Sequence, residues 1–165
     1  MCKFKSADAI FEYETDTVKL VFGIMEDSHT EIRKKNHIAE VVGNGEPKHT
    51  PVEYYPTGAM DDFGDYKFVF DDSRPNWWTD EMTESAISQF QSEISKMLKN
   101  PQWIYGGNLY LGSVTTLPKG FNPKVGGYLY LNSVTTLPKD NKITADNIYF
   151  DGKWHGKIVN GKFIK

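Results

Sequence analysis

Histidine and cysteine side chains could supply acid–base, nucleophilic or metal chemistry, and this chain has four histidines and one cysteine. The histidines, His29, His37, His49 and His155, lie in polar segments. His29 and His37 are eight residues apart, whereas a helical zinc site needs its histidines at i and i+4. Cys2 has no neighbour that would activate it as a nucleophile. We therefore expect all four histidines at the surface and assign no base, nucleophile or metal ligand.

Acidic and glycine-rich stretches are also poor candidates for a catalytic or metal site. Residues 61–65 and the pair Asp71-Asp72 are acidic, but their spacing does not match a calcium loop with its several ligands and distal Glu. The Gly-Asn-Gly stretch at 43–45 has neither the lysine nor the spacing of a phosphate-binding loop. The sequence therefore predicts no catalytic residue, no metal site and no cofactor, and we do not expect an enzyme.

Regularly spaced tyrosines and lysines are the remaining candidates, and their chemistry is that of binding. Tyrosine offers a large contact area at low entropic cost, so a rigid row of exposed tyrosines suits an interface. The alternative interpretation is cross-strand packing that only stabilises a sheet. The predicted binding residues are Tyr110, Tyr128, Tyr130, Tyr149, Lys119 and Lys139.

An internal repeat positions these residues. Residues 106–119, GGNLYLGSVTTLPK, recur at 126–139 as GGYLYLNSVTTLPK, with a period of 20 and identity at 12 of 14 positions. A third, degenerate copy aligns 147–150 with 128–131 at a period of 19. The Gly-Gly pair permits the positive φ or tight corner that begins each strand. Self-similarity at a fixed period indicates stacked structural repeats.

The alternation within one copy predicts which side chains face the core. Leu109 and Leu111 flank Tyr110, so the leucines point to one side of a strand and the tyrosine to the other. Stacking would place Leu109 beside Leu129 and Ile148, because one copy alone cannot bury its leucines. We therefore expect a short parallel β-solenoid of about three turns.

The repeated unit L-Y-L-x-x-V-T-T-L-P-K, followed by F-N-P-K-V-G-G at 121–127, resembles the short leucine-rich-type repeats of some bacterial and phage proteins. The resemblance covers residues 103–152. Val114 and Val134 stand where ordinary leucine-rich repeats carry an Asn. The first hundred residues resemble leader regions of phage hypothetical proteins. The family has no shared catalytic residues, and the resemblance implies a phage-encoded modulator or inhibitor of a host protein, such as a CRISPR-type defence nuclease.

Residues 1–100 predict a small α+β domain. Apolar and β-branched residues at 9–13 and 18–24 predict a hairpin, and 52–55 and 66–70 predict two further strands after a loop at 43–51. Ser28-His29-Thr30-Glu31 is a capping-box sequence that predicts a short helix.

A longer helix is predicted after Trp77-Trp78, with Thr79 as its N-cap. Its apolar stripe includes Met82, Ala86, Phe90 and Ile94. We expect one of the two tryptophans to pack under the helix start rather than to anchor an interface.

The long helix should end at Lys99, because Asn100 precedes a proline. We expect it to cap the open end of the solenoid. The predicted organisation is an α+β leader over 1–100 with a capping helix, then a short β-solenoid over 101–165. Residues from Trp154 to Ile164 would form a closing hairpin at the other end.

Composition and charge bound the class of protein. The chain has 165 residues, 39% hydrophobic and 14% aromatic, which is enough apolar mass for a core. A single cysteine excludes an internal disulfide. We see no signal peptide, and the apolar stretch Leu20–Met25 is far shorter than the roughly 20 residues that span a bilayer. We therefore expect a cytoplasmic protein without a membrane partner, in the host cytoplasm if it is phage-encoded.

The net charge of −3 is distributed unevenly between the two halves. Residues 1–100 hold 11 Lys and Arg against 19 Asp and Glu, whereas residues 101–165 hold 8 Lys against 3 Asp. Two functional hypotheses follow. The first is a non-catalytic module that binds a host protein, or a nucleoprotein complex, through the tyrosine face. The alternative is single-stranded nucleic-acid (RNA) binding, with tyrosines stacking bases and lysines contacting phosphates. End-to-end stacking of solenoids also makes a dimer compatible with this architecture.

Overall fold

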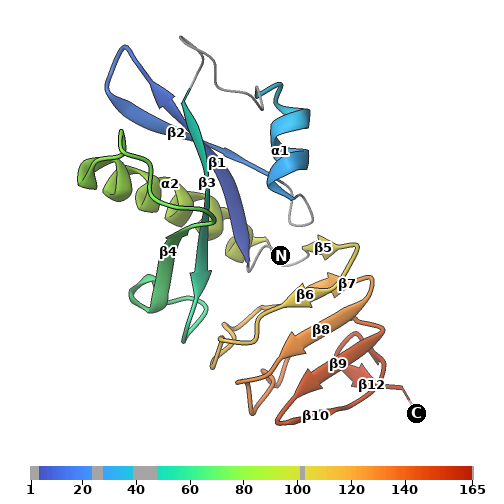
Figure 1. The fold of residues 1–165 in the computed structure, drawn as a ribbon. Helices are drawn as coiled ribbons and strands as arrows, with labels where there is room; N and C mark the ends of the chain where they lie inside the picture. The colour runs from blue at the N-terminus through green and yellow to red at the C-terminus, as the bar shows by residue number, and fades with distance from the viewer. Residues whose placement is uncertain (1–3, 24–27, 39–47, 101–102, 165) are drawn as a thin grey trace. The chain divides into compact units, whose positions relative to one another are not determined.

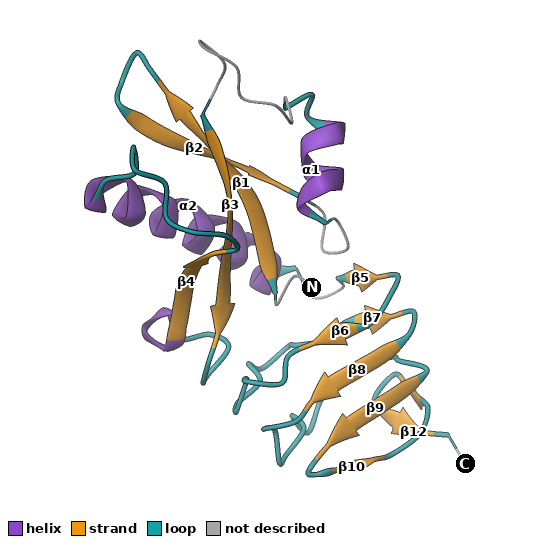
Figure 2. Cartoon of the chain, viewed as in Figure 1, coloured by secondary structure: helices purple, strands orange, loops and turns teal. Residues whose placement is uncertain are grey.

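The computed structural model describes residues 4–23, 28–38, 48–100 and 103–164 (Figures 1 and 2). Its contacts divide the chain into two compact units. The N-terminal unit comprises residues 1–54 and 68–94, and the C-terminal unit comprises 55–67 and 95–165. The residues between strands β3 (His49–Pro56) and β4 (Tyr66–Phe70) therefore belong to the C-terminal unit, whereas most of these two strands belongs to the N-terminal unit.

The N-terminal unit is built on a four-stranded sheet with the strand order β2-β1-β3-β4. Strands β1 (Lys5–Glu12) and β2 (Thr17–Phe22) form an antiparallel hairpin, and β3 (His49–Pro56) pairs antiparallel with the other edge of β1. Strand β4 (Tyr66–Phe70) lies beside β3. The predicted hairpin and both predicted strands are confirmed. The predicted loop is wrong at its end, because residues 49–51 already belong to β3.

Helix α2 (Asp80–Lys99) covers one face of this sheet (Figure 2). Its buried Phe90 contacts the rings of Phe22, Tyr54 and Phe68 at centroid distances of 5.3, 5.5 and 6.2 Å. The side chain of Gln89 also links α2 to β2, because it accepts a hydrogen bond from Leu20 N and donates one to Val18 O, both at 2.9 Å. The predicted boundaries of this helix are confirmed, and its buried Phe90 packs on the N-terminal sheet.

The shorter helix α1 (His29–Lys35) packs on the opposite face of the sheet, beside β1. Its start is the predicted capping box: Ser28 accepts from the backbone of Glu31, and the Glu31 side chain accepts from the backbone of Ser28. Because side chains alternate along a strand, Ala7 and Ala9 of β1 share the α2 face, whereas Asp8 faces α1. The α1 side of the sheet is therefore polar.

One tryptophan of the pair before α2 packs under the start of the helix, as predicted. Trp78 is buried, lies 5.0 Å from the Phe70 ring and 6.0 Å from the Phe68 ring, and donates from Nε1 to Thr83 Oγ1 at 2.8 Å. Trp77 contacts Phe11 at 5.5 Å. Both indoles thus fill space around the start of α2.

Copies of the repeat pair in parallel in the C-terminal unit. Strands β6 (Leu109–Tyr110), β8 (Tyr128–Leu131) and β9 (Asn147–Phe150) lie side by side, so that Leu109, Leu129 and Ile148 are in register, as predicted. All three are buried. Strand β5 (Ile104–Tyr105) pairs in parallel with β7 (Lys124–Val125) in a separate two-stranded sheet.

The predicted parallel β-solenoid of about three turns is nevertheless wrong. The molecule is a small α+β fold with two helices and several separate sheets, antiparallel and mixed, among its described residues. Strand β10 (Lys153–Trp154) turns back antiparallel onto β9 across Asp151-Gly152, both of which have positive φ. Strands β11 (Ile158–Val159) and β12 (Lys162–Phe163) form a hairpin within the predicted closing segment as a separate antiparallel sheet, whereas Trp154, which was predicted to belong to that hairpin, pairs with β9. Parallel pairing of strands in this sheet therefore ends at β9, where the chain reverses.

The segment between β3 and β4 occupies the start of the repeats, where a cap was predicted from the long helix. Ala59 forms a parallel bridge with Thr116, and Met60 N donates to Thr116 O at 3.0 Å. Asp65, in the 3₁₀ turn Phe63–Asp65, accepts from Ala59 N at 2.8 Å. The acidic stretch 61–65 thus contributes to holding this segment in shape.

Candidate functional site

The outer face of the sheet β10-β9-β8-β6 carries the predicted tyrosines. In-register pairing places Tyr110 beside Tyr130 and Tyr130 beside Tyr149. Tyr128 lies two residues before Tyr130 on β8 and therefore points to the same side. The intervening Leu129 is buried. The predicted alternation of buried aliphatic and outward aromatic side chains is confirmed.

Trp154 joins this row, which sequence reasoning did not foresee. The pairing of β10 with β9 sets Trp154 opposite Tyr149. Its indole contacts the rings of Tyr128, Tyr130 and Tyr149 edge-on, at centroid distances of 5.6, 5.3 and 5.2 Å. The signal that could have found it is the Asp151-Gly152 pair, since Asp-Gly is a strong two-residue hairpin signal. We call Tyr110, Tyr128, Tyr130, Tyr149 and Trp154 the aromatic face.

The aromatic face is ordered by ring contacts and open to solvent at two positions. Tyr110 and Tyr130 stack with centroids 4.4 Å apart and planes 11° from parallel. Tyr128 is 45% exposed and Trp154 is 46% exposed. Large aromatic side chains held in this way at a surface are suited to burial against another molecule.

The pKa of the Tyr130 phenol is raised above its ordinary value of 10.0, first by desolvation and then by a hydrogen bond with Tyr110 and the nearby Tyr110 and Tyr128 phenols. The folded state therefore holds this proton more tightly than the unfolded chain. We expect the associated stability to be present below pH 10 and to be lost as the pH rises through the raised pKa.

Tyrosinate absorbance during alkaline titration would measure this shift, as the difference between the native protein and Tyr130→Phe. Tyr110→Phe should move the pKa of Tyr130 back towards 10.0, because it removes the hydrogen bond. An ordinary pKa for Tyr130 in the native protein would contradict the arrangement of the two stacked rings.

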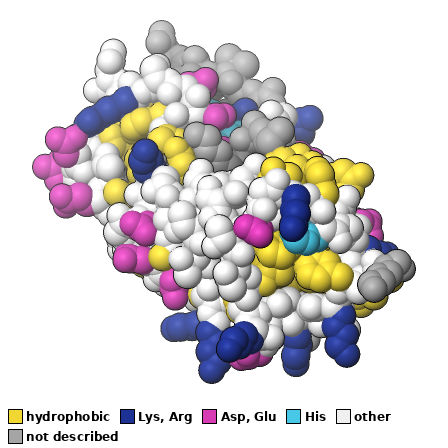
Figure 3. Space-filling view, turned by 90° about the horizontal axis from the view of Figure 1, so that it is seen from below, with side chains coloured by type: hydrophobic (Ala, Val, Ile, Leu, Met, Phe, Trp, Pro, Cys, Tyr) yellow, Lys and Arg dark blue, Asp and Glu magenta, His cyan; other side chains and the backbone are white. Residues whose placement is uncertain are grey.

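The two predicted lysines lie in turns, at the corners that follow the strands. Lys119 and Lys139 each follow the Leu-Pro pair of one copy and are exposed. The structure thus places them one repeat apart and outside the aromatic face. Figure 3 shows several Lys and Arg side chains along the lower edge of that view, and hydrophobic side chains next to a histidine.

The prediction that all four histidines lie at the surface is wrong for His29, which is 8% exposed. The side chain of His49 is only 10% exposed, because its residue begins β3 instead of lying in a loop. His37 is exposed, as predicted. His155 is half-buried and stacks on Phe150 with centroids 3.9 Å apart. Cys2 and the glycine-rich stretch 43–45 lie outside the described residues.

A polar cluster lies between the sheet and α1, around the fully buried Asp8. Asp8 Oδ1 lies 3.3 Å from Arg33 Nη1 and 3.5 Å from His49 Nδ1, and Asp8 Oδ2 lies 3.8 Å from His29 Nδ1. One ligand atom each from His29, Glu53 and Asp71 lies within 4.8 Å of the other two. The alternation Ser6-Ala7-Asp8-Ala9 could have indicated one polar and one apolar face of β1.

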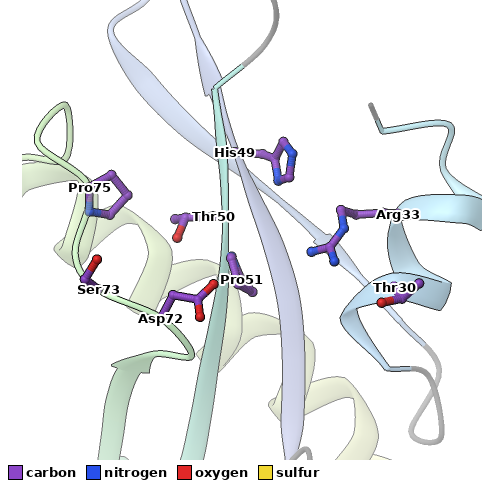
Figure 4. Close-up of a pocket in the computed structure, with 8 residues that line it drawn as sticks. All are labelled: Thr30, Arg33, His49, Thr50, Pro51, Asp72, Ser73 and Pro75. Atoms are coloured by element: carbon purple, nitrogen blue, oxygen red, sulfur yellow. The ribbon is translucent and has the colours of Figure 1, made fainter. Parts of the chain in front are cut away.

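An open pocket adjoins this cluster, with a volume of about 650 Å³. Figure 4 shows Arg33 reaching from α1 towards β3, while the residues that follow β4 form the other wall. The pocket is lined by Thr30, Arg33, His49, Thr50, Pro51, Asp72, Ser73 and Pro75. Its volume is in the range of small-molecule sites, which run from about 300 to 1,000 Å³.

No known family model, curated protein or solved structure shows significant similarity to this chain. Within the described part of the chain, neither helix combines the length and the apolar composition that crossing a bilayer requires. The aromatic face and the polar cluster are therefore interpreted from their own geometry.

Proposed function

We propose that this protein is a non-catalytic binding module that engages another protein through the aromatic face. The observation that carries the proposal is the position of Trp154, whose indole is 46% exposed although three tyrosine rings hold it in place. Tryptophan and tyrosine are enriched among the residues that dominate binding energy at protein interfaces. A surface tryptophan fixed before binding loses little further side-chain entropy on association.

The strands beneath the aromatic face add rigidity. Leu109, Leu129 and Ile148 anchor β6, β8 and β9 in the core of the C-terminal unit. Tyr149 is further restrained because its hydroxyl donates to Gly152 O at 3.0 Å. A face supported in this way presents one fixed shape, which favours a structured partner surface over a flexible chain.

Charge favours a partner with an acidic surface. The C-terminal unit contains 11 Lys and 6 Asp, so its field attracts negative charge and speeds association with it. The resemblance of the repeats to those of bacterial and phage proteins supports a host protein, such as a CRISPR-type defence nuclease, as the target. On this proposal the protein acts in the host cytoplasm.

Single-stranded RNA is the alternative ligand of the same face. Base stacking needs a free ring face, and the mutual stacking of Tyr110 and Tyr130 uses one face of each ring. This observation favours the protein partner, and the nucleic-acid alternative becomes an outcome of the test.

The test is capture of partners from bacterial lysate by the tagged protein, with and without nuclease, followed by affinity measurement on the purified partner. We expect one dominant protein that survives nuclease. Trp154→Ala should weaken its binding about 30-fold, which corresponds to about 2 kcal/mol for an interface hot spot.

Phe163→Ala is the matched control, because Phe163 is 44% exposed but lies on β12, outside the aromatic face. It should bind like the native protein. Equal affinities for Trp154→Ala and the native protein would overturn the proposal. Loss of every partner after nuclease would instead support RNA binding.

A further inference from the structure

Three elements of the N-terminal unit bring His29, Glu53 and Asp71 together. His29 is the first residue of α1, Glu53 lies on β3, and Asp71 directly follows β4. His29 Nε2 lies 4.0 Å from Glu53 Oε1 and 3.8 Å from Asp71 Oδ2. The backbone of Asp71 is fixed beside β3, because its N–H donates to Pro51 O at 3.1 Å.

The imidazole of His29 is buried without a hydrogen bond at either nitrogen. The residue is 8% exposed. The carboxylate oxygens that face it, at 3.8 to 4.0 Å, lie beyond the hydrogen-bonding range of about 2.7–3.2 Å. A buried polar group without a hydrogen bond costs free energy. The His29 Nε2 atom faces the carboxylates of Glu53 and Asp71, and Glu53 is itself buried. The space between Nε2 and the two carboxylates therefore favours a cation.

We propose that His29 Nε2, Glu53 Oε1 and Asp71 Oδ2 bind one divalent transition-metal ion. Ligand atoms held at about 2.1 Å from a tetrahedral ion lie about 3.4 Å from one another. The Nε2–oxygen separations of 3.8 and 4.0 Å therefore need to close by only about half an ångström. One ion would neutralise the facing carboxylates and occupy the unbonded Nε2.

Asp8 faces the histidine on its other side. Asp8 Oδ2 lies 3.8 Å from His29 Nδ1, while Oδ1 lies 3.3 Å from Arg33 Nη1. Metal-bound histidines usually donate their second N–H to a carboxylate or carbonyl, which sets the tautomer and raises the basicity of the ligating nitrogen. The fully buried Asp8 is placed to accept that proton, so Nε2 stays free to bind the metal.

The donor set favours zinc over the hard cations. One imidazole and two carboxylates suit Zn²⁺, whereas Ca²⁺ takes six to eight oxygens and Mg²⁺ keeps an octahedral shell rich in water. The side chain of Asp71 is 51% exposed, so one side of the site is open to solvent for the entry of the ion and for a water ligand. The rival interpretation is a doubly protonated His29 that forms ion pairs with these carboxylates and binds no metal.

Calorimetric titration of the chelator-treated full-length protein with ZnCl₂ tests the proposal, with MgCl₂ as the comparison. We expect a saturable site of one Zn²⁺ per chain that is absent with Mg²⁺. Asp71→Asn should weaken this binding at least about 10-fold, because a ligand charge is lost. Asp8→Asn should weaken it by about 10- to 100-fold, the usual effect of changing a residue that orients a ligand.

Asp72→Asn is the matched control, because Asp72 is the exposed neighbour of Asp71 but not one of the three proposed ligands. It should bind Zn²⁺ like the native protein, and circular dichroism should show that all three variants are folded. Absence of saturable Zn²⁺ binding would overturn the proposal in favour of the protonated histidine. Binding that is equal in Asp71→Asn and Asp72→Asn would overturn it by placing the metal elsewhere. Neither result depends on the aromatic face or its partner.

Discussion

Replacement of Phe90 by alanine is expected to lower the free energy of unfolding by about 3–5 kcal/mol, the usual cost of truncating a buried phenylalanine. Phe90 is fully buried on α2, and its ring contacts Phe22, Tyr54 and Phe68 from three strands of one sheet. The substitution removes these contacts and leaves a cavity that the rigid sheet cannot fill. Urea denaturation followed by far-ultraviolet circular dichroism measures the change.

Ser88→Ala is the control for this measurement, because Ser88 lies on the same helix and is exposed. It should change stability by less than about 0.5 kcal/mol, as is usual for surface substitutions. If Phe90→Ala were as stable as Ser88→Ala, α2 could not pack against the sheet in the way described.

Gly126→Ala should destabilise the C-terminal unit by about 1–3 kcal/mol, the usual cost of overpacking. A methyl group at this position would clash with the carbonyl oxygen of Gly106 in the preceding copy of the repeat. The clash is with backbone, which cannot rotate away as a side chain could. The backbone of Gly126 is also fixed, since its N–H donates to Tyr105 O at 2.6 Å. The difference in thermal unfolding temperature between Gly126→Ala and the native protein measures the effect.

Gly107→Ala is the matched control from the same repeat. Gly107 has no atom within 4 Å of the place where a Cβ would lie, and its φ is not positive. This variant should therefore unfold at the temperature of the native protein or slightly higher, because alanine restricts the unfolded chain. Equal destabilisation by both substitutions would show that the copies do not approach one another as closely as the structure describes.

The elements that were predicted correctly are those whose signals are local. The β1–β2 hairpin, α1 with its capping box and α2 with its apolar stripe follow from alternation, from capping residues and from helical periodicity. The register of Tyr110, Tyr130 and Tyr149 also follows from the repeat alone, since identical segments that pair in parallel place identical residues side by side.

The sequence alone does not identify which surfaces meet. The apolar stripe of α2 predicts that one face of the helix is buried. From the sequence, both the open end of the repeats and the N-terminal sheet could offer the apolar surface that buries it. The structure shows that Phe90 packs on the sheet, while Met60 is held at the start of the repeats by its bond to Thr116. Hydrophobic patterning alone does not distinguish such partners, because burial of apolar surface is not directional.

The candidate sites divide in the same way. Tyr110, Tyr130 and Tyr149 were predicted because they recur in a periodic pattern, whereas Trp154 occurs once and reaches the aromatic face only through the reversal at Asp151-Gly152. His29, Glu53 and Asp71 are far apart in the chain and share no spacing rule.

By itself, the sequence determined the local elements, the repeat and the row of tyrosines, because each depends on contacts between neighbours in the chain or between copies of one segment. Only the tertiary structure decided the partner of Phe90 on α2, the end of parallel strand pairing at β9 and the assembly of the histidine–carboxylate cluster. Gly107 and Gly127 hold equivalent places in the repeat, yet a Cβ at Gly127 would meet Asn108 and Gly107 while one at Gly107 would meet nothing within 4 Å. The residue type is the same, and the neighbours that folding supplies are different.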